Sequence, residues 1–294
     1  MDSLTMSKDS ATIETRISKW LESQGYPLEM FVAQSFKEIG QVIQSDFYTD
    51  PVTGKLREID VKTYCTTGPA RPDHEHFIQV GCTIECKLAR DKPWILFTTQ
   101  PDFDGGLWLP TLAVGSKLGE WLLHKMASRD PSSIPAGFDR AERIAAYGIT
   151  QAFTDGLDVP FQAVNSAFKA ANAWAAQIDR DNESSSERVS YSCICFPTVV
   201  IDGRLFECLL DGDDRTIVRE VKSGILAWKQ TSDDAGPKTI YIFTRPAVSE
   251  LVQKVEKATD ALQVILAKQK LFSELIEARQ RVYPRKQTPS TTIE

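Results

Sequence analysis

The sequence predicts an α/β fold in which a mixed central sheet is flanked by helices. Three observations lead to this prediction. The chain has 294 residues, 42% of them hydrophobic, which is enough to bury a sizeable core. Short alternating runs typical of strands lie at about 41–98 and 189–245. Longer segments with helical spacing of apolar residues lie before, between and after them. We expect one domain over residues 1–294, with little beyond linkers to divide it.

The first third of the chain predicts two helices followed by strands. The helices are expected at 10–24, with Ser10 as its cap, and at 28–39, and Gly25 and Gly40 are their stop signals. Strands are expected at 41–48, 56–64, 77–88 and 93–99, with a polar loop at 65–76.

The remainder predicts a helical insertion, a β-rich extension and a closing helix. The insertion spans about 100–188 and is most clearly helical at 118–126 and 161–178. A surface linker is expected at 179–187. Asp202-Gly203 is a hairpin signal that joins strands at 189–201 and 205–210. Further strands are expected at 216–221, 225–229 and 239–244, then a long helix at about 248–281 and a disordered tail at 284–294.

Composition limits the classes of function. With 34 Lys and Arg against 40 Asp and Glu, the net charge is −6, so any DNA site must be a local basic patch or part of an assembly. No apolar run is long enough to cross a membrane, and the polar N-terminus does not resemble a signal peptide. The six cysteines form no CxxC pair and fit reduced core residues, so we expect a cytoplasmic protein.

Acidic side chains follow the strand period at two places. In the strand around Asp60, the residues Ile59 and Val61 face the core and Asp60 faces the other way. In the strand Thr83 to Leu88, the side chains of Glu85 and Lys87 share one face, opposite Cys86. If the two strands are neighbours, Asp60, Glu85 and Lys87 converge.

This combination fits a hard divalent metal beside a phosphodiester. Asp60 and Glu85 can each offer a carboxylate oxygen to Mg²⁺, and the backbone carbonyl of Cys86 can offer a third. A metal-bound water is acidic enough to attack phosphorus. Lys87 would either orient or deprotonate that water or stabilise charge on the phosphorus. Mn²⁺ is a plausible substitute for Mg²⁺.

The pattern resembles the PD-(D/E)xK nuclease superfamily, which includes restriction endonucleases and archaeal Holliday-junction resolvases. The resemblance rests on Glu29 in a helix, Gly40 eleven residues later, Asp60 in an apolar strand and the sequence Glu85-Cys86-Lys87. It covers about residues 26–98, and a strand around 195–200, within 189–210, would be the fourth core strand. The family's usual proline before the Asp is replaced here by Ile59.

The resemblance implies a restriction-endonuclease-like sheet and an enzyme, a Mg²⁺-dependent DNA endonuclease that leaves 5′-phosphate and 3′-hydroxyl ends. Its catalytic residues would be Glu29, Asp60, Glu85 and Lys87. A defence or DNA-processing role follows by family analogy alone. The resemblance is compatible with a homodimer and with a protein partner that supplies targeting.

Structural explanations compete with these assignments. Glu85 and Lys87 would also form a surface ion pair on an exposed strand, and an acid in a first helical turn, such as Glu29, is favoured by the helix dipole alone. Glu58 shares the face of Asp60 under strict alternation and is a reserve ligand.

Two other patterns deserve comparison with the main one. A second acid–lysine pattern combines Asp211 with Glu220-Val221-Lys222, although a turn at Gly212-Asp213-Asp214 explains its acids. The pair His74-x-His76 lies in the predicted polar loop, where solvent exposure is the simpler explanation.

Two further hypotheses differ in class. In the first, the chain is a catalytically inactive nuclease-fold subunit that binds nucleic acid or protein, as its acidic charge and long C-terminal helix would favour. In the second, the motif is a coincidence in an unrelated α/β protein, and this hypothesis predicts that Asp60 and Glu85 lie far apart.

Overall fold

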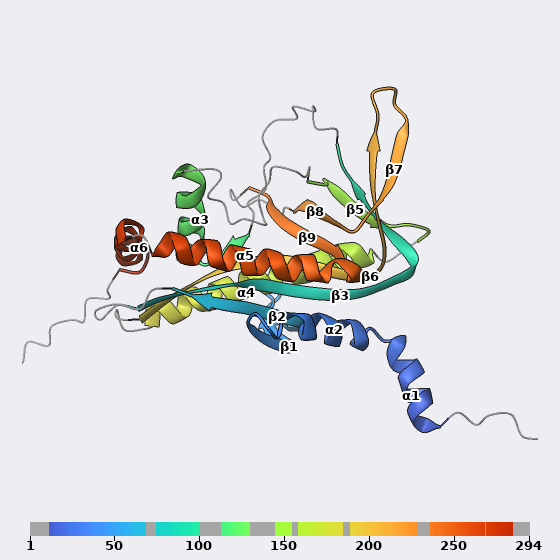
Figure 1. Cartoon of the computed structure of the whole chain (residues 1–294), viewed down its shortest axis with the longest axis horizontal. Helices are drawn as coiled ribbons and strands as arrows, with labels where there is room; N and C mark the ends of the chain where they lie inside the picture. The colour runs from blue at the N-terminus through green and yellow to red at the C-terminus, as the bar shows by residue number, and fades with distance from the viewer. Residues whose placement is uncertain are drawn as a thin grey trace, which may run out of the picture.

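The computed structural model describes residues 12–68, 75–99, 113–129, 145–154, 158–184, 189–228, 236–267 and 269–284. Within them, nine strands form one mixed sheet with helices on both faces (Figure 1). This confirms the α/β prediction in its general form. The more specific restriction-endonuclease arrangement stays a prediction.

Six strands form the main path of the sheet, in the order β1-β2-β3-β6-β9-β8. The pairs β1–β2, β2–β3 and β9–β8 are antiparallel, whereas β3–β6 and β6–β9 are parallel. The short strands β4 and β7 pair with β6, and β5 pairs with β3. The bounds are β1 Gln41–Thr49, β2 Leu56–Thr67, β3 Glu75–Phe97, β4 Val114–Gly115, β5 Gly148–Gln151, β6 Val189–Leu210, β7 Thr216–Val221, β8 Ser223–Trp228 and β9 Lys238–Thr244.

The hairpin predicted at Asp202-Gly203 is wrong. Residues 189–210 form one strand, β6, that runs parallel to β3 through this dipeptide, with Leu88 opposite Asp202 and Ala89 opposite Gly203. The strands predicted at 77–88 and 93–99 are likewise one strand, β3, with a register shift between Ala89 and Trp94. Glycine is needed at 203 because a Cβ there would lie 2.2 Å from the carbonyl oxygen of Ala89.

The stretch predicted as a helical insertion connects β3 to β6. Two parallel strands need a crossover connection, and this one carries α3 Lys117–Arg129 and α4 Val159–Ser184. Both predicted helices are therefore present, but the stretch also contributes β4 and β5 to the sheet. The linker predicted at 179–187 is wrong for residues 179–184, because α4 continues to Ser184.

Helices cover the sheet from two sides and create two apolar clusters. One cluster joins the sheet to α2 (Tyr26–Phe36), α3, α5 (Val248–Leu266) and α6 (Gln269–Val282). Phe36, Leu122 and Leu251 are among its buried members. The other joins the opposite side to α4, where Val164, Ala171 and Trp174 are buried. Because both faces are covered, residues 192–201 of β6 are buried without alternation, as expected for a central parallel strand.

The N-terminal helices differ slightly from the prediction. Helix α1 spans Ile13–Glu22 and is capped by Thr12 rather than Ser10, and α2 spans Tyr26–Phe36. No residue of α1 is buried, and the helix lies away from the sheet (Figure 1). Helix α2 packs against the sheet and takes part in the first apolar cluster.

The single long C-terminal helix predicted at 248–281 is wrong. It consists of α5 Val248–Leu266 and α6 Gln269–Val282, preceded by the short 3₁₀ helix η2 Arg245–Ala247. Buried residues of both helices belong to the cluster that includes α3. The two helices run in different directions (Figure 1), and each buries an apolar face in that cluster. The predicted tail lies outside the described residues from 285 onward.

All six cysteines are free, and the prediction that they are core residues is confirmed for all except Cys208. Among the described residues, the helices include none that is both long and apolar enough to cross a membrane.

Candidate active site

The strands β2 and β3 bring Asp60 and Glu85 together. Their antiparallel register pairs Val61 with Ile84, so the next position along places Asp60 opposite Glu85. The backbone N–H of Cys86 donates to Asp60 Oδ2 at 2.7 Å. The side chain of Asp60 thus links β2 to β3 one residue beyond Val61 and Ile84, the last paired residues of the two strands. The prediction of the coincidence hypothesis, that Asp60 and Glu85 lie far apart, is therefore wrong.

Lys87 lies between the two carboxylates. Its Nζ is 2.5 Å from Glu85 Oε2 and 3.7 Å from Asp60 Oδ2. The side chain of Glu85 is only 7% exposed, whereas those of Asp60 and Lys87 are 20% and 29% exposed. Asp60, Glu85 and Lys87 thus form a cluster of charged side chains, called the cluster below. Glu85 lies at its buried end, and Lys87 and Asp60 lie at its accessible end.

Burial and charge shift the proton equilibria of this pair. Burial raises the pKa of Glu85, although the ammonium of Lys87 opposes the shift. Burial lowers the pKa of Lys87, but the carboxylates of Glu85 and Asp60 outweigh it and leave the pKa above its ordinary value. Lys87 is therefore a cation at neutral pH.

Helix α2 adds the carboxylate of Glu29. Leu28, Val32 and Phe36 bury one side of this helix against the sheet, and that packing fixes the position of Glu29 in its first turn. Burial raises the pKa of Glu29 to about 7. The negative charges of Asp60, Glu58 and Glu85 act in the same direction. Glu29 is thus in electrostatic range of the cluster, and the reserve ligand Glu58 is in electrostatic range of Glu29.

Helix α4 supplies a residue that the sequence analysis missed. The hydroxyl of Ser166 donates to Glu85 Oε1 at 2.5 Å, and the hydroxyl of Tyr48 on β1 is 3.4 Å from Ser166 Oγ. Ser166 is 81 residues from Glu85 in the chain. Sequence spacing carries no signal for such a contact, because it depends on how α4 crosses the sheet.

A buried ion pair anchors α4 beside this cluster. Lys169 Nζ lies 2.8 Å from Asp50 Oδ2, while Asp50 Oδ1 accepts from the backbone N–H groups of Val52 and Thr53. The ammonium of Lys169, the strongest influence, lowers the pKa of Asp50 from 3.8 to about 2. Asp50 therefore joins the turn after β1 to the helix that carries Ser166.

We expect Asp50→Asn to destabilise the protein by about 2 kcal/mol at pH 7, because Lys169 loses its charged partner. The folded-state pKa of Asp50 is depressed, so its contribution is complete above about pH 4 and is lost as the pH falls toward 2. Urea unfolding of both proteins at pH 7 and pH 3 checks this. An equal difference in unfolding free energy at the two pH values would contradict it.

The ligand atoms around the cluster are oxygens, the type that a hard divalent cation prefers. Asp60 and Glu85 offer carboxylates, and the Cys86 carbonyl points to the β2 side, because its N–H does so and both groups of a strand residue point the same way. Lys87 and Ser166 already contact Glu85, so a cation would have to displace Lys87 from Glu85 Oε2. Within the described ranges, no three His, Cys, Asp or Glu side chains are grouped closely enough to hold a metal.

The alternative patterns take structural roles. Glu220 on β7 forms a two-bond ion pair with Arg204, with distances of 2.7 and 3.0 Å. Asp211 accepts from the backbone N–H groups of Asp213 and Arg215 and so holds the turn before β7. The rival pattern therefore belongs to an exposed two-stranded ribbon, with β7 projecting from the body of the protein (Figure 1).

The prediction of a solvent-exposed His76 is wrong. His76 lies in β3, which begins at Glu75, and is fully buried. Its ring nitrogens lie 2.6 Å from Ser190 Oγ and 3.1 Å from Ser192 Oγ on β6. These two hydroxyls satisfy the ring inside the sheet. His74 lies outside the described residues.

Comparisons of this chain with protein-family models, with curated proteins and with solved structures found no match.

Proposed function

We propose that the protein is a Mg²⁺-dependent DNA endonuclease whose site is formed by Glu29, Asp60, Glu85 and Lys87. The observation that carries the proposal is the position of Lys87, whose ammonium contacts carboxylates from two different strands. A hydrolytic phosphodiesterase needs carboxylates for a metal and a cation for the transition-state charge in one place. This arrangement supplies both.

Each residue has a role that follows from its position. Asp60, Glu85 and the Cys86 carbonyl would hold Mg²⁺ or Mn²⁺, which supplies an acidic water and neutralises phosphate charge. The Cys86 N–H orients Asp60, and Ser166 orients Glu85. Lys87, once released from Glu85, would orient the attacking water or stabilise the charge on phosphorus. Glu29 adds a third carboxylate, in electrostatic range of these groups.

Cleavage of supercoiled plasmid DNA tests the proposal. The protein is expected to nick or linearise plasmid in Mg²⁺ or Mn²⁺ and to be inactive in EDTA. The new ends should carry 5′-phosphate, which ligation without prior kinase treatment detects. Activity that persists in EDTA would contradict the proposed metal dependence.

A specific observation favours a second candidate, a nuclease-fold subunit that binds nucleic acid or protein without cutting it. Both oxygens of Glu85 already have partners, Lys87 and Ser166, as expected for a structural ion-pair cluster. This candidate predicts DNA or protein binding without cleavage in any metal. A homodimer, a targeting partner and a cytoplasmic location stay predictions under either function.

Under the proposed function, Ser166 is a positioning residue for Glu85. We expect Ser166→Ala to lower kcat about tenfold with little change in KM, because the carboxylate loses the bond that orients it. Ser166→Thr keeps a hydroxyl and should restore most of the activity. The measurement is steady-state cleavage of a labelled oligonucleotide duplex. A tenfold loss in the Thr variant as well would indicate a packing role instead.

A further inference from the structure

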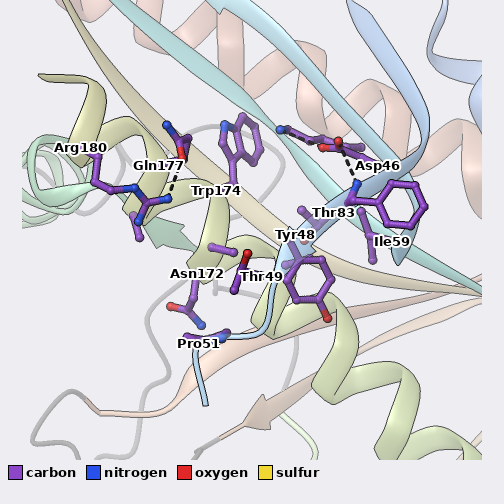
Figure 2. Close-up of a pocket in the computed structure, with 15 residues that line it drawn as sticks. Asp46, Tyr48, Thr49, Pro51, Ile59, Thr83, Asn172, Trp174, Gln177 and Arg180 are labelled. Atoms are coloured by element: carbon purple, nitrogen blue, oxygen red, sulfur yellow. Dashed lines mark hydrogen bonds and ion pairs between the residues drawn. The ribbon is translucent and has the colours of Figure 1, made fainter. Parts of the chain in front are cut away.

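A pocket of about 420 Å³ lies next to the cluster, between β1 and α4. Figure 2 shows Tyr48 and Thr49 on one wall and Asn172, Trp174 and Arg180 of α4 on the other. Its volume is in the range of pockets that hold small ligands. It is too small for a base-paired duplex.

The pocket borders the candidate active site. Thr83 in its lining lies two residues before Glu85 on β3, and Ile59 in its lining directly precedes Asp60 on β2. Tyr48, also in the lining, has its hydroxyl 3.4 Å from Ser166 Oγ, and Ser166 donates to Glu85. A group in the pocket would therefore lie close to a phosphodiester held at the cluster.

The walls combine aromatic rings with cations. Tyr48 lines the pocket, is half-buried and points toward α4, where its hydroxyl lies near Ser166. The preceding residue of the strand, Phe47, points to the opposite face. Lys62 pairs with Asp46 at 3.1 Å and lies 5.1 Å from the centre of the Trp174 ring. Trp174 itself is buried, so the accessible ring surface comes from Tyr48.

Amide side chains and an arginine complete the wall formed by α4. Arg180 donates to Gln177 Oε1 at 2.6 Å, and both side chains are exposed. The Nδ2 group of Asn172 donates to the carbonyl of Phe168, and the Oδ1 atom of Asn172 takes no part in this hydrogen bond. Amides recognise the edges of unpaired bases, aromatic rings stack on their faces, and Lys and Arg contact phosphate.

We propose that this pocket binds one unpaired nucleotide of the DNA strand, adjacent to the phosphodiester at the cluster. The inference rests on the proposed function, because it assigns the pocket to the strand that the cluster would cleave. It makes single-stranded DNA, or DNA with an unpaired nucleotide, the preferred substrate. It also gives an acidic chain a local surface for nucleic acid, with Lys62 and Arg180 as its cations.

The test is fluorescence anisotropy of the full-length protein with a labelled single-stranded DNA oligonucleotide and with the matching duplex. Binding is measured in EDTA and again in Ca²⁺. We expect the single strand to bind at least tenfold more tightly than the duplex. Tyr48→Ala should weaken single-strand binding about tenfold, through lost stacking. Arg180→Ala should weaken it less and should reduce the salt dependence by about one phosphate contact.

Matched controls use exposed residues outside the pocket. Phe153, which is 85% exposed, and Arg204 on β6 provide one aromatic and one arginine control. Phe153→Ala and Arg204→Ala should bind like the wild type. Unchanged folding of all four variants is checked by circular dichroism and thermal unfolding.

The outcomes distinguish a failure of the pocket proposal from a failure of the proposed nuclease activity. Wild-type cleavage with unchanged binding in the Tyr48 and Arg180 variants overturns the proposal for the pocket and leaves the proposed nuclease. Pocket-dependent binding without cleavage supports the pocket and overturns the nuclease. If the wild type binds duplex and single strand with equal affinity, or binds neither in EDTA or in Ca²⁺, the proposal for the pocket is overturned. A free mononucleotide that binds as tightly as the oligonucleotide overturns the assignment to a strand.

Discussion

Asp60→Asn is expected to abolish both cleavage and tight metal binding, whereas Lys87→Met is expected to abolish cleavage alone. Asp60 would be a ligand, and an amide is a far weaker ligand for Mg²⁺ than a carboxylate. Lys87 instead forms an ion pair with Glu85, with its Nζ 2.5 Å from the carboxylate, and so competes with a metal ion for this ligand. Removing the ammonium should therefore keep metal affinity or raise it. Loss of charge stabilisation should lower kcat by about 10³-fold.

Isothermal titration calorimetry with Mn²⁺ and plasmid cleavage measure the two effects separately. Glu220→Gln is the matched control, because it alters the rival acid–lysine pattern on the exposed ribbon and should leave both quantities unchanged. Loss of cleavage in this control, with full activity in the Asp60 and Lys87 variants, would move the active site to β7. Full cleavage by the Lys87 variant alone would leave Lys87 with a structural role only.

Gly203→Ala is expected to destabilise the fold by about 2–3 kcal/mol. Its new Cβ would lie 2.2 Å from the carbonyl oxygen and 2.8 Å from the Cβ of Ala89, inside the central β3–β6 pair. The strand must move apart from its neighbour or bend. Because Ala89 is two residues from Lys87, the same displacement should also reduce cleavage.

Gly212→Ala is the matched control for this prediction. A Cβ at 212 meets no atom within 4 Å, and both substitutions restrict the unfolded chain equally. The difference between the two variants in urea unfolding therefore isolates the clash at 203. A hairpin turn at Asp202-Gly203 would instead leave Gly203 free of β3. Equal stability of the two variants would thus contradict the continuous strand.

Local periodicity predicted much of the sheet. Alternation at 83–88 predicted that Cys86 faces the core, and Cys86 is 6% exposed within an apolar cluster. The same period predicted that Asp60, Glu85 and Lys87 would converge if their strands were neighbours. The strands are neighbours, and Lys87 contacts both acids. Whether these residues catalyse anything stays a prediction.

The turn chemistry at Asp202-Gly203 was misleading for a physical reason. Gly favours a turn where the backbone needs a positive φ, but it also permits close approach of another strand. The described glycines with positive φ are Gly25, Gly54 and Gly68. Only the position of Ala89 on β3, more than a hundred residues earlier, decides which use applies at Gly203.

By itself, the sequence determined the elements whose signals are local, namely the alternation of the strands, the spacing of apolar residues in the helices and the acids placed on strand faces. The tertiary structure alone decided that α5 and α6 separate, that His76 is satisfied by two serines, and that Ser166 holds Glu85. Those features depend on contacts between residues far apart in the chain. Such contacts form only when whole faces are buried together, and no short window of sequence contains both partners.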